Sequence, residues 1–196
     1  MSAAIRPVAW VKTIAPEDAT GTLKEAYDWQ AARLGEPTEY TQLGSLHPEL
    51  VLERLRLYKV VEGSLGGLTA LEQKLVVYVT SVVNATPHCA SGARLALEQL
   101  DADSDLVSRA AATPLDPQTG DSRLDAVIRY TGLLAATPGA VTEADIQGLR
   151  AVGLGDADIV ALNNLVAYYA YTNRVATGLG LRSAIPERHA LHAVPR

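Results

Sequence analysis

Apolar residues recur three and four positions apart along most of the chain. The pattern covers residues 21–34, and it returns at Leu52, Leu55, Tyr58 and Val61. This spacing puts the apolar residues on one face of a helix and leaves the other face to polar residues. We therefore predict an amphipathic helix over 21–34 and a second, longer one that contains the other four residues.

The clearest helix start lies at Thr69, which is followed three residues later by Glu72. This is the capping-box spacing, in which the Thr hydroxyl and the Glu carboxylate satisfy unpaired backbone N–H groups of the first turn. The run at 75–83 is apolar on nearly every side, which is typical of a helix inside a bundle. Its β-branched residues also permit a buried strand, but its length and the preceding cap favour a helix.

Further helix starts follow along the chain. Thr86 suits the N-cap position of a helix and Pro87 its first position, where the missing N–H has no consequence. Ser104 and Thr142 suit the caps of two shorter helices, and Asp156 opens the last long helix. These signals predict helices through the rest of the chain, with the two between residues 69 and 100 forming a hairpin.

The fold class and the domain boundaries follow from this survey. Residues 112–120 hold two prolines and a glycine, which indicates a surface connection within one domain. No strand pattern matches the helical ones in strength. We predict an all-α single domain over residues 1–182, followed by a tail or arm over 183–196 that lacks periodicity.

Composition excludes several classes of protein. Hydrophobic residues make up 48% of the 196 residues and charged residues 20%, which is too apolar for a disordered chain. The formal net charge is −5 and no dense Lys/Arg cluster is present, so nucleic acid is not an expected partner. Neither an export signal nor a membrane span is recognisable. A single cysteine cannot form an internal disulfide, and we expect a cytoplasmic protein.

The best candidate for chemistry is Cys89. If Thr86 is the N-cap, Cys89 is the third residue of its helix, where N–H groups and the helix dipole favour a thiolate. We therefore expect a lowered pKa, with His88 as a neighbouring acid or base. The alternative is that Cys89 is a small buried hydrophobic residue and His88 an ordinary polar one.

The segment from Val82 to Cys89 resembles the central motif of the AhpD-like alkylhydroperoxidase and carboxymuconolactone decarboxylase family. Residues 16–21, 47–50 and 173–176 are similar to its "peroxidase-related" branch, and the resemblance spans about residues 10–181. It implies an AhpD-like helical bundle that assembles as a homo-oligomer. It also implies reduction of peroxides by a pair of cysteines, without a metal or other cofactor.

Carried over by position, the resemblance implies that Cys89 is the peroxide-attacking thiol and that His88 matches the histidine before it. The first motif cysteine falls on Thr86, the upstream glutamate on Lys74 and the downstream histidine on Ala93. The internal disulfide and the usual proton relay are therefore missing, so full peroxidase turnover is not expected.

Three functions are compatible with these observations. The first is a thiol-dependent redox protein that reduces peroxides through one cysteine, with a small-molecule peroxide or thiol as its partner. The second is a decarboxylase-like enzyme acting on a small carboxylated metabolite. The third is a non-catalytic binding or assembly protein, which the three departures favour. The position of Cys89 at its helix start places the redox hypothesis first, and whether the protein is an enzyme stays open.

Overall fold

The computed structural model describes residues 9–63, 66–183 and 185, and these residues form nine α-helices and no strand. In chain order the α-helices are α1 (Gly21–Leu34), α2 (Glu39–Leu43), α3 (Pro48–Gly63), α4 (Ala70–Val83), α5 (Pro87–Gln99), α6 (Ser104–Ala112), α7 (Ser122–Ala136), α8 (Glu143–Ala151) and α9 (Asp156–Gly178). Two short 3₁₀ turns lie at Pro16–Asp18 and Pro138–Ala140. The all-α prediction is confirmed.

Helix α4 lies at the centre of the fold and packs against α5, α7 and α9. Its capping box is present: Glu72 N donates to Thr69 Oγ1 over 3.1 Å, and Thr69 N donates to Glu72 Oε2 over 2.7 Å. The fully buried apolar residues of the run at 75–83 are Leu75, Val76 and Val79. The run at 75–83 is therefore helix, and the strand alternative is wrong.

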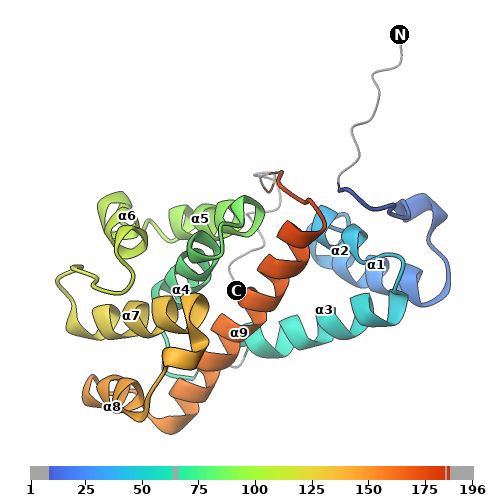
Figure 1. Ribbon diagram of the computed structural model, residues 1–196. Helices are drawn as coiled ribbons and strands as arrows, with labels where there is room; N and C mark the ends of the chain where they lie inside the picture. Colours follow the sequence, from blue (N-terminus) through green and yellow to red (C-terminus); the bar gives the residue numbers. More distant parts are fainter. Residues whose placement is uncertain (1–8, 64–65, 184, 186–196) are drawn as a thin grey trace.

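Helix α9 divides the molecule into two groups of helices. Figure 1 shows α1, α2 and α3 on one side of α9 and the α4–α8 group on the other. Helix α3 packs against α1 and α9, while α4, α7 and α8 pack against the opposite side of α9. The main apolar core lies between the larger group and α9, and it includes Val127, Leu162 and Val166, all fully buried. The candidate site lies where the two groups meet.

Some local expectations need correction. Ser104 does not cap α6 but is its first residue, because the Asp103 carboxylate accepts from the N–H groups of Asp105 and Leu106 instead. An ionised carboxylate is the stronger acceptor at a helix start, where the dipole also favours negative charge. The short helix α2, which the sequence analysis does not predict, precedes α3 and has Thr38 as its N-cap.

The beginning of the predicted tail contacts α5. Ile185 N donates to Ser91 Oγ over 2.9 Å. A side chain on Gly92 would bring its Cβ to 2.5 Å from the Ile185 side chain, so glycine permits this approach. The rest of the predicted tail, residues 184 and 186–196, lies outside the described residues. Among the described helices, none is both long and apolar enough to cross a membrane.

Candidate functional site

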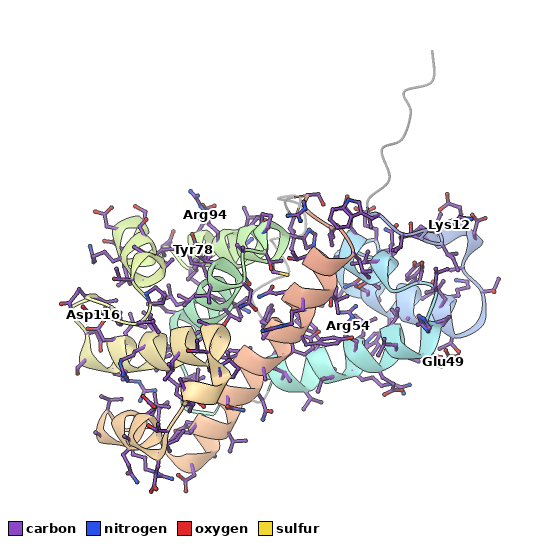
Figure 2. The ribbon with its side chains drawn as sticks, in the orientation of Figure 1. Lys12, Glu49, Arg54, Tyr78, Arg94 and Asp116 are labelled. Atoms are coloured by element: carbon purple, nitrogen blue, oxygen red, sulfur yellow. The ribbon has the colours of Figure 1, made fainter. Side chains whose placement is uncertain are left out.

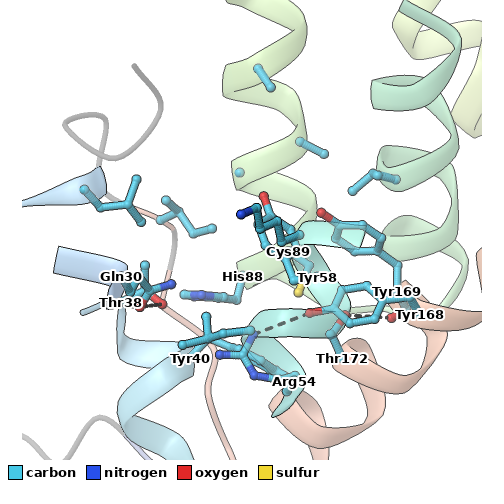
Figure 3. A pocket seen from close by; sticks show the side chains of 18 of the residues that line it. Gln30, Thr38, Tyr40, Arg54, Tyr58, His88, Cys89, Tyr168, Tyr169 and Thr172 are labelled. Atoms are coloured by element: carbon cyan, nitrogen blue, oxygen red, sulfur yellow. Dashed lines mark hydrogen bonds between the residues drawn. The ribbon is translucent and has the colours of Figure 1, made fainter. Parts of the chain in front are cut away.

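A cavity of about 350 Å³ lies between the two groups of helices. Side chains of α1, α2, α3, α4, α5 and α9 line it, and Ile185 completes the wall. Its lining is largely apolar and aromatic; the aromatic residues are Trp29, Tyr40, Tyr58, Tyr168 and Tyr169. Figure 3 shows the sulfur of Cys89 facing this space, beside Tyr58 and Tyr168. Such a volume suits a small organic molecule.

Cys89 is the third residue of α5, as the sequence predicts, but its pKa is not lowered. Burial against the apolar wall raises the pKa of the Cys89 thiol to about 12, and this outweighs the opposite effects of the Thr172 hydroxyl and the Arg54 charge. Desolvation disfavours the thiolate more than the helix start favours it. The expectation of an acidic thiol is therefore wrong, and the thiol is protonated at neutral pH.

Thr86 precedes α5 but does not cap it with its side chain. The hydroxyl is buried, donates to the Asn84 carbonyl oxygen over 3.2 Å, and lies 3.1 Å from Thr177 Oγ1 on α9. It is thus engaged away from the N–H groups of the first turn of α5. Thr86, which stands where the resemblance places the first motif cysteine, therefore links the start of α5 to α9.

His88 lines the same cavity as Cys89 and is only 3% exposed. Its Nδ1 lies 2.7 Å from the carbonyl oxygen of Ser183. A carbonyl oxygen only accepts hydrogen bonds, so Nδ1 carries the hydrogen. This bond fastens the segment after α9 to the start of α5. A role of His88 as acid or base toward Cys89 stays a prediction.

Lys74 stands where the resemblance places a relay glutamate, and it is buried at one end of the cavity. Its Nζ lies 2.8 Å from Glu62 Oε2, with the two side chains 5% and 7% exposed. Tyr169 donates its hydroxyl to Glu62 Oε1 over 2.7 Å. The positive charge of Lys74 is therefore neutralised within the protein. Ala93, in the place of the relay histidine, contributes only a methyl group to the wall.

Arg54 enters the cavity from α3 with no carboxylate partner among the described residues. Its Nη2 donates to Thr41 Oγ1 over 2.8 Å, and its Nη1 lies 3.5 Å from the Tyr168 hydroxyl. The guanidinium carbon stands 4.7 Å from the centre of the Tyr40 ring. Figure 2 shows Arg54 between α3 and α9, in contrast to four labelled charged residues at the periphery, Lys12, Glu49, Arg94 and Asp116.

Sequence reasoning did not find Arg54 or Glu62. Both lie four residues from Tyr58, so the three share one face of α3. The sequence did contain a signal for these two site residues. Two charged residues flank an aromatic one at helical spacing, on a helix that packs against its neighbours. No group of acidic, histidine or cysteine side chains that could hold a metal ion occurs among the described residues.

Comparison of sequences finds no matching family model and no matching curated protein. Comparison of structures finds clear likenesses. An AhpD-core, uncharacterised peroxidase-related protein from Ralstonia eutropha JMP134 has a TM-score of 0.81 at 19% identity, covering 98% of this chain and 100% of that one. An uncharacterised peroxidase-related protein from Silicibacter sp. TM1040 has a TM-score of 0.75 at 19% identity, covering 91% and 93%.

A third likeness has a different activity. The debrominase Bmp8, as a cysteine-to-alanine variant in complex with 2,3,4-tribromopyrrole, has a TM-score of 0.70 at 14% identity and covers 96% of this chain and 97% of that one. These likenesses show that the chain has the AhpD-like helical fold along nearly its whole length. Proteins of this fold differ in activity, so the fold leaves the reaction to be argued from the site.

Proposed function

We propose that this protein is a peroxidase-related, thiol-dependent redox protein that reduces a small organic hydroperoxide through Cys89. The observation that carries the proposal is the position of Cys89 on the wall of an aromatic cavity of about 350 Å³. The peroxidase-related proteins with the same fold support the class. The debrominase, solved with a small aromatic ligand and a replaced cysteine, supports the pairing of a thiol with an organic molecule.

The proposed reaction needs one thiol from the protein and two from outside. The Cys89 sulfur attacks the terminal peroxide oxygen, the O–O bond breaks, and the alcohol leaves with the proton of the thiol. Cys89 then carries a sulfenic acid. Because the chain has a single cysteine, one external thiol forms a mixed disulfide with release of water, and a second restores Cys89.

The reaction is expected to be slow. With the pKa of Cys89 raised to about 12, little thiolate exists at neutral pH, and the thiolate is the reactive form. Thr172 and Arg54 oppose this effect, so they are the groups that would stabilise a thiolate when it forms. The raised pKa also favours a second candidate, a ligand-binding protein in which Cys89 is only a wall residue.

The test compares the wild-type protein with Cys89→Ser, using cumene hydroperoxide and excess dithiothreitol. We expect slow, saturable hydroperoxide consumption that the substitution abolishes, together with trapping of a sulfenic acid at Cys89 by dimedone. Hydrogen peroxide, which cannot fill the cavity, should react more slowly. Equal consumption by the two proteins would exclude the redox function and favour the ligand-binding alternative.

We also propose that the protein assembles as a homo-oligomer. The large apolar residues Leu50, Leu57 and Val60 of α3 are more than half exposed in the single chain, at 57%, 51% and 60%, which supports an assembly that covers them. Sedimentation velocity at micromolar concentration should give a mass of at least two chains. A monomer under those conditions would contradict the proposal.

A further inference from the structure

Arg54, which lines the cavity together with the basic residues Arg33, Lys59 and Lys74, has no carboxylate partner among the described residues. Arg54 has five N–H donors, and its hydrogen bonds within the described residues use one from each terminal nitrogen, both to neutral hydroxyl groups. Its guanidinium stacks on the Tyr40 ring. A guanidinium in apolar surroundings is stabilised by a bound anion, and its fork of donors fits a carboxylate.

A second donor accompanies Arg54. The hydroxyl of Tyr40 is buried and has no hydrogen-bond partner among the described residues. Burial raises the pKa of Tyr40 above its ordinary value, so the group keeps its proton and can donate. A buried polar group without a partner is unfavourable unless something in the completed site satisfies it. Tyr40 and Arg54 line the same cavity as Cys89.

At the other end of the cavity, Lys74 does not compete for an anion. There Lys74 is paired with Glu62, and Glu62 also accepts from Tyr169. An acid that places its charged group at Arg54 rather than at the neutralised Lys74 has its apolar body among the aromatic side chains.

We propose that the cavity binds a small organic acid whose carboxylate is held by Arg54 and the Tyr40 hydroxyl, and whose apolar body lies beside Cys89. This inference rests on the proposed function, for which it names the substrate class: a hydroperoxide that carries a carboxylate. One guanidinium and one hydroxyl match a single negative charge shared by two oxygens. The aromatic walls and the volume of the cavity limit the size of the apolar part of the bound acid.

The test is a calorimetric titration with cinnamate and with cinnamamide, which has a similar shape but no charge. Cinnamate should bind the wild-type protein at least about tenfold more tightly, because hydrogen bonds to a charged group are stronger than those to a neutral one. Arg54→Gln should remove this preference, and Tyr40→Phe should weaken cinnamate binding several-fold. Bound cinnamate should also protect Cys89 from alkylation.

The matched control is Arg56→Gln, since Arg56 lies on the same helix but is 53% exposed and pairs with Glu53 and Glu25. It should leave the preference unchanged. Arg54→Lys, with circular dichroism as a check of folding, covers the case in which Arg54→Gln does not fold. Lysine keeps the positive charge but lacks the paired N–H donors of the guanidinium, so part of the preference for cinnamate should remain.

Three results would overturn the inference: equal binding of the two molecules, binding of neither at millimolar concentration, or a preference that survives Arg54→Gln. The outcome is independent of the redox proposal, because Cys89→Ser should keep the preference for cinnamate. A preference without hydroperoxide consumption rejects the redox function alone. Consumption of cumene hydroperoxide without a preference rejects the acid-binding site alone.

Discussion

Two of the basic residues that line the cavity, Arg54 at one end and Lys74 at the other, have opposite surroundings. Arg54, Tyr58 and Glu62 follow one another at intervals of four along α3, so one helix face spans both ends, roughly 12 Å apart along the axis. At the Glu62 end the Lys74 ammonium has a carboxylate at 2.8 Å. At the Arg54 end the described residues supply only hydroxyl groups and an aromatic ring.

The difference separates a structural charge from a charge that is available for binding. A buried ion pair that is satisfied on both sides holds elements together, and here it joins α3 to α4 and, through Tyr169, to α9. An unpaired guanidinium beside a cavity adds little to folding but provides a place for an anion. The four predictions below test this distinction, from the largest expected effect to the smallest.

Removal of Glu62 should have the largest effect on folding. Glu62→Leu leaves the Lys74 ammonium buried without a partner, which costs about 3–5 kcal/mol in free energy of unfolding. Urea denaturation followed by circular dichroism measures the loss. Glu53→Leu, on the same helix but 61% exposed, is the matched control and should change stability by no more than about 0.5 kcal/mol.

The double variant Glu62→Leu/Lys74→Met sharpens this result. It removes both charges together, so most of the lost stability should return. If Glu62→Leu alone is as stable as the wild-type protein, the ion pair between Lys74 and Glu62 does not stabilise the packing of α3 on α4.

The reactivity of Cys89 should show the next largest effect. Because burial raises its pKa to about 12, alkylation by iodoacetamide at pH 9 should be roughly five-hundredfold slower in the folded protein than in urea. Arg54→Gln removes a charge that stabilises the thiolate, so it should slow the reaction further. The double variant at the Glu62 end should leave the rate nearly unchanged. Alkylation of the folded protein with a midpoint below pH 8.5 would contradict the raised pKa.

The same pKa predicts how stability depends on pH. The unfolded thiol loses its proton near its ordinary pKa of about 9, whereas the folded thiol keeps it up to about 12. Deprotonation therefore favours the unfolded chain, and the stability from Cys89 is present below pH 9 and declines above it. Between pH 8 and pH 10 the wild-type protein should lose about 1–2 kcal/mol more than Cys89→Ser. Parallel curves for the two proteins would contradict this.

The sequence was sufficient for the helices and insufficient for the chemistry of the site. Hydrophobic periodicity and helix caps are local features of the sequence. The capping box at Thr69 and the start of α5 at Pro87 are therefore predicted at the positions where they occur. The pKa of Cys89 depends on the wall around it, which α3 and α9 supply from distant parts of the chain. A helix start alone indicated a lowered pKa, and burial reversed it.

The two cations show the same limit. The sequence placed Lys74 in the site, but its partner Glu62 lies on another helix, and nothing near Arg54 in the sequence indicates that it lacks a carboxylate. Such pairing is a long-range property, because Thr41 and Tyr168, which contact Arg54, lie 13 and 114 residues from it. Positions carried over from the family identified what was missing at Thr86, Lys74 and Ala93. These positions did not show which contacts the replacing side chains make in the folded protein.

The smallest expected effect is that of Arg54→Met on stability. The substitution removes a half-buried guanidinium and two hydrogen bonds to hydroxyl groups but leaves no opposite charge without a partner. Its methylenes and sulfur still pack on the Tyr40 ring. The lost bonds and the relieved desolvation oppose each other, so the free energy of unfolding should change by less than about 1 kcal/mol. Urea denaturation in parallel with Glu62→Leu gives the comparison directly. A loss at Arg54 as large as the loss at Glu62 would mean that both cations are structural, and the assignment of the Arg54 end to ligand binding would then lose its basis.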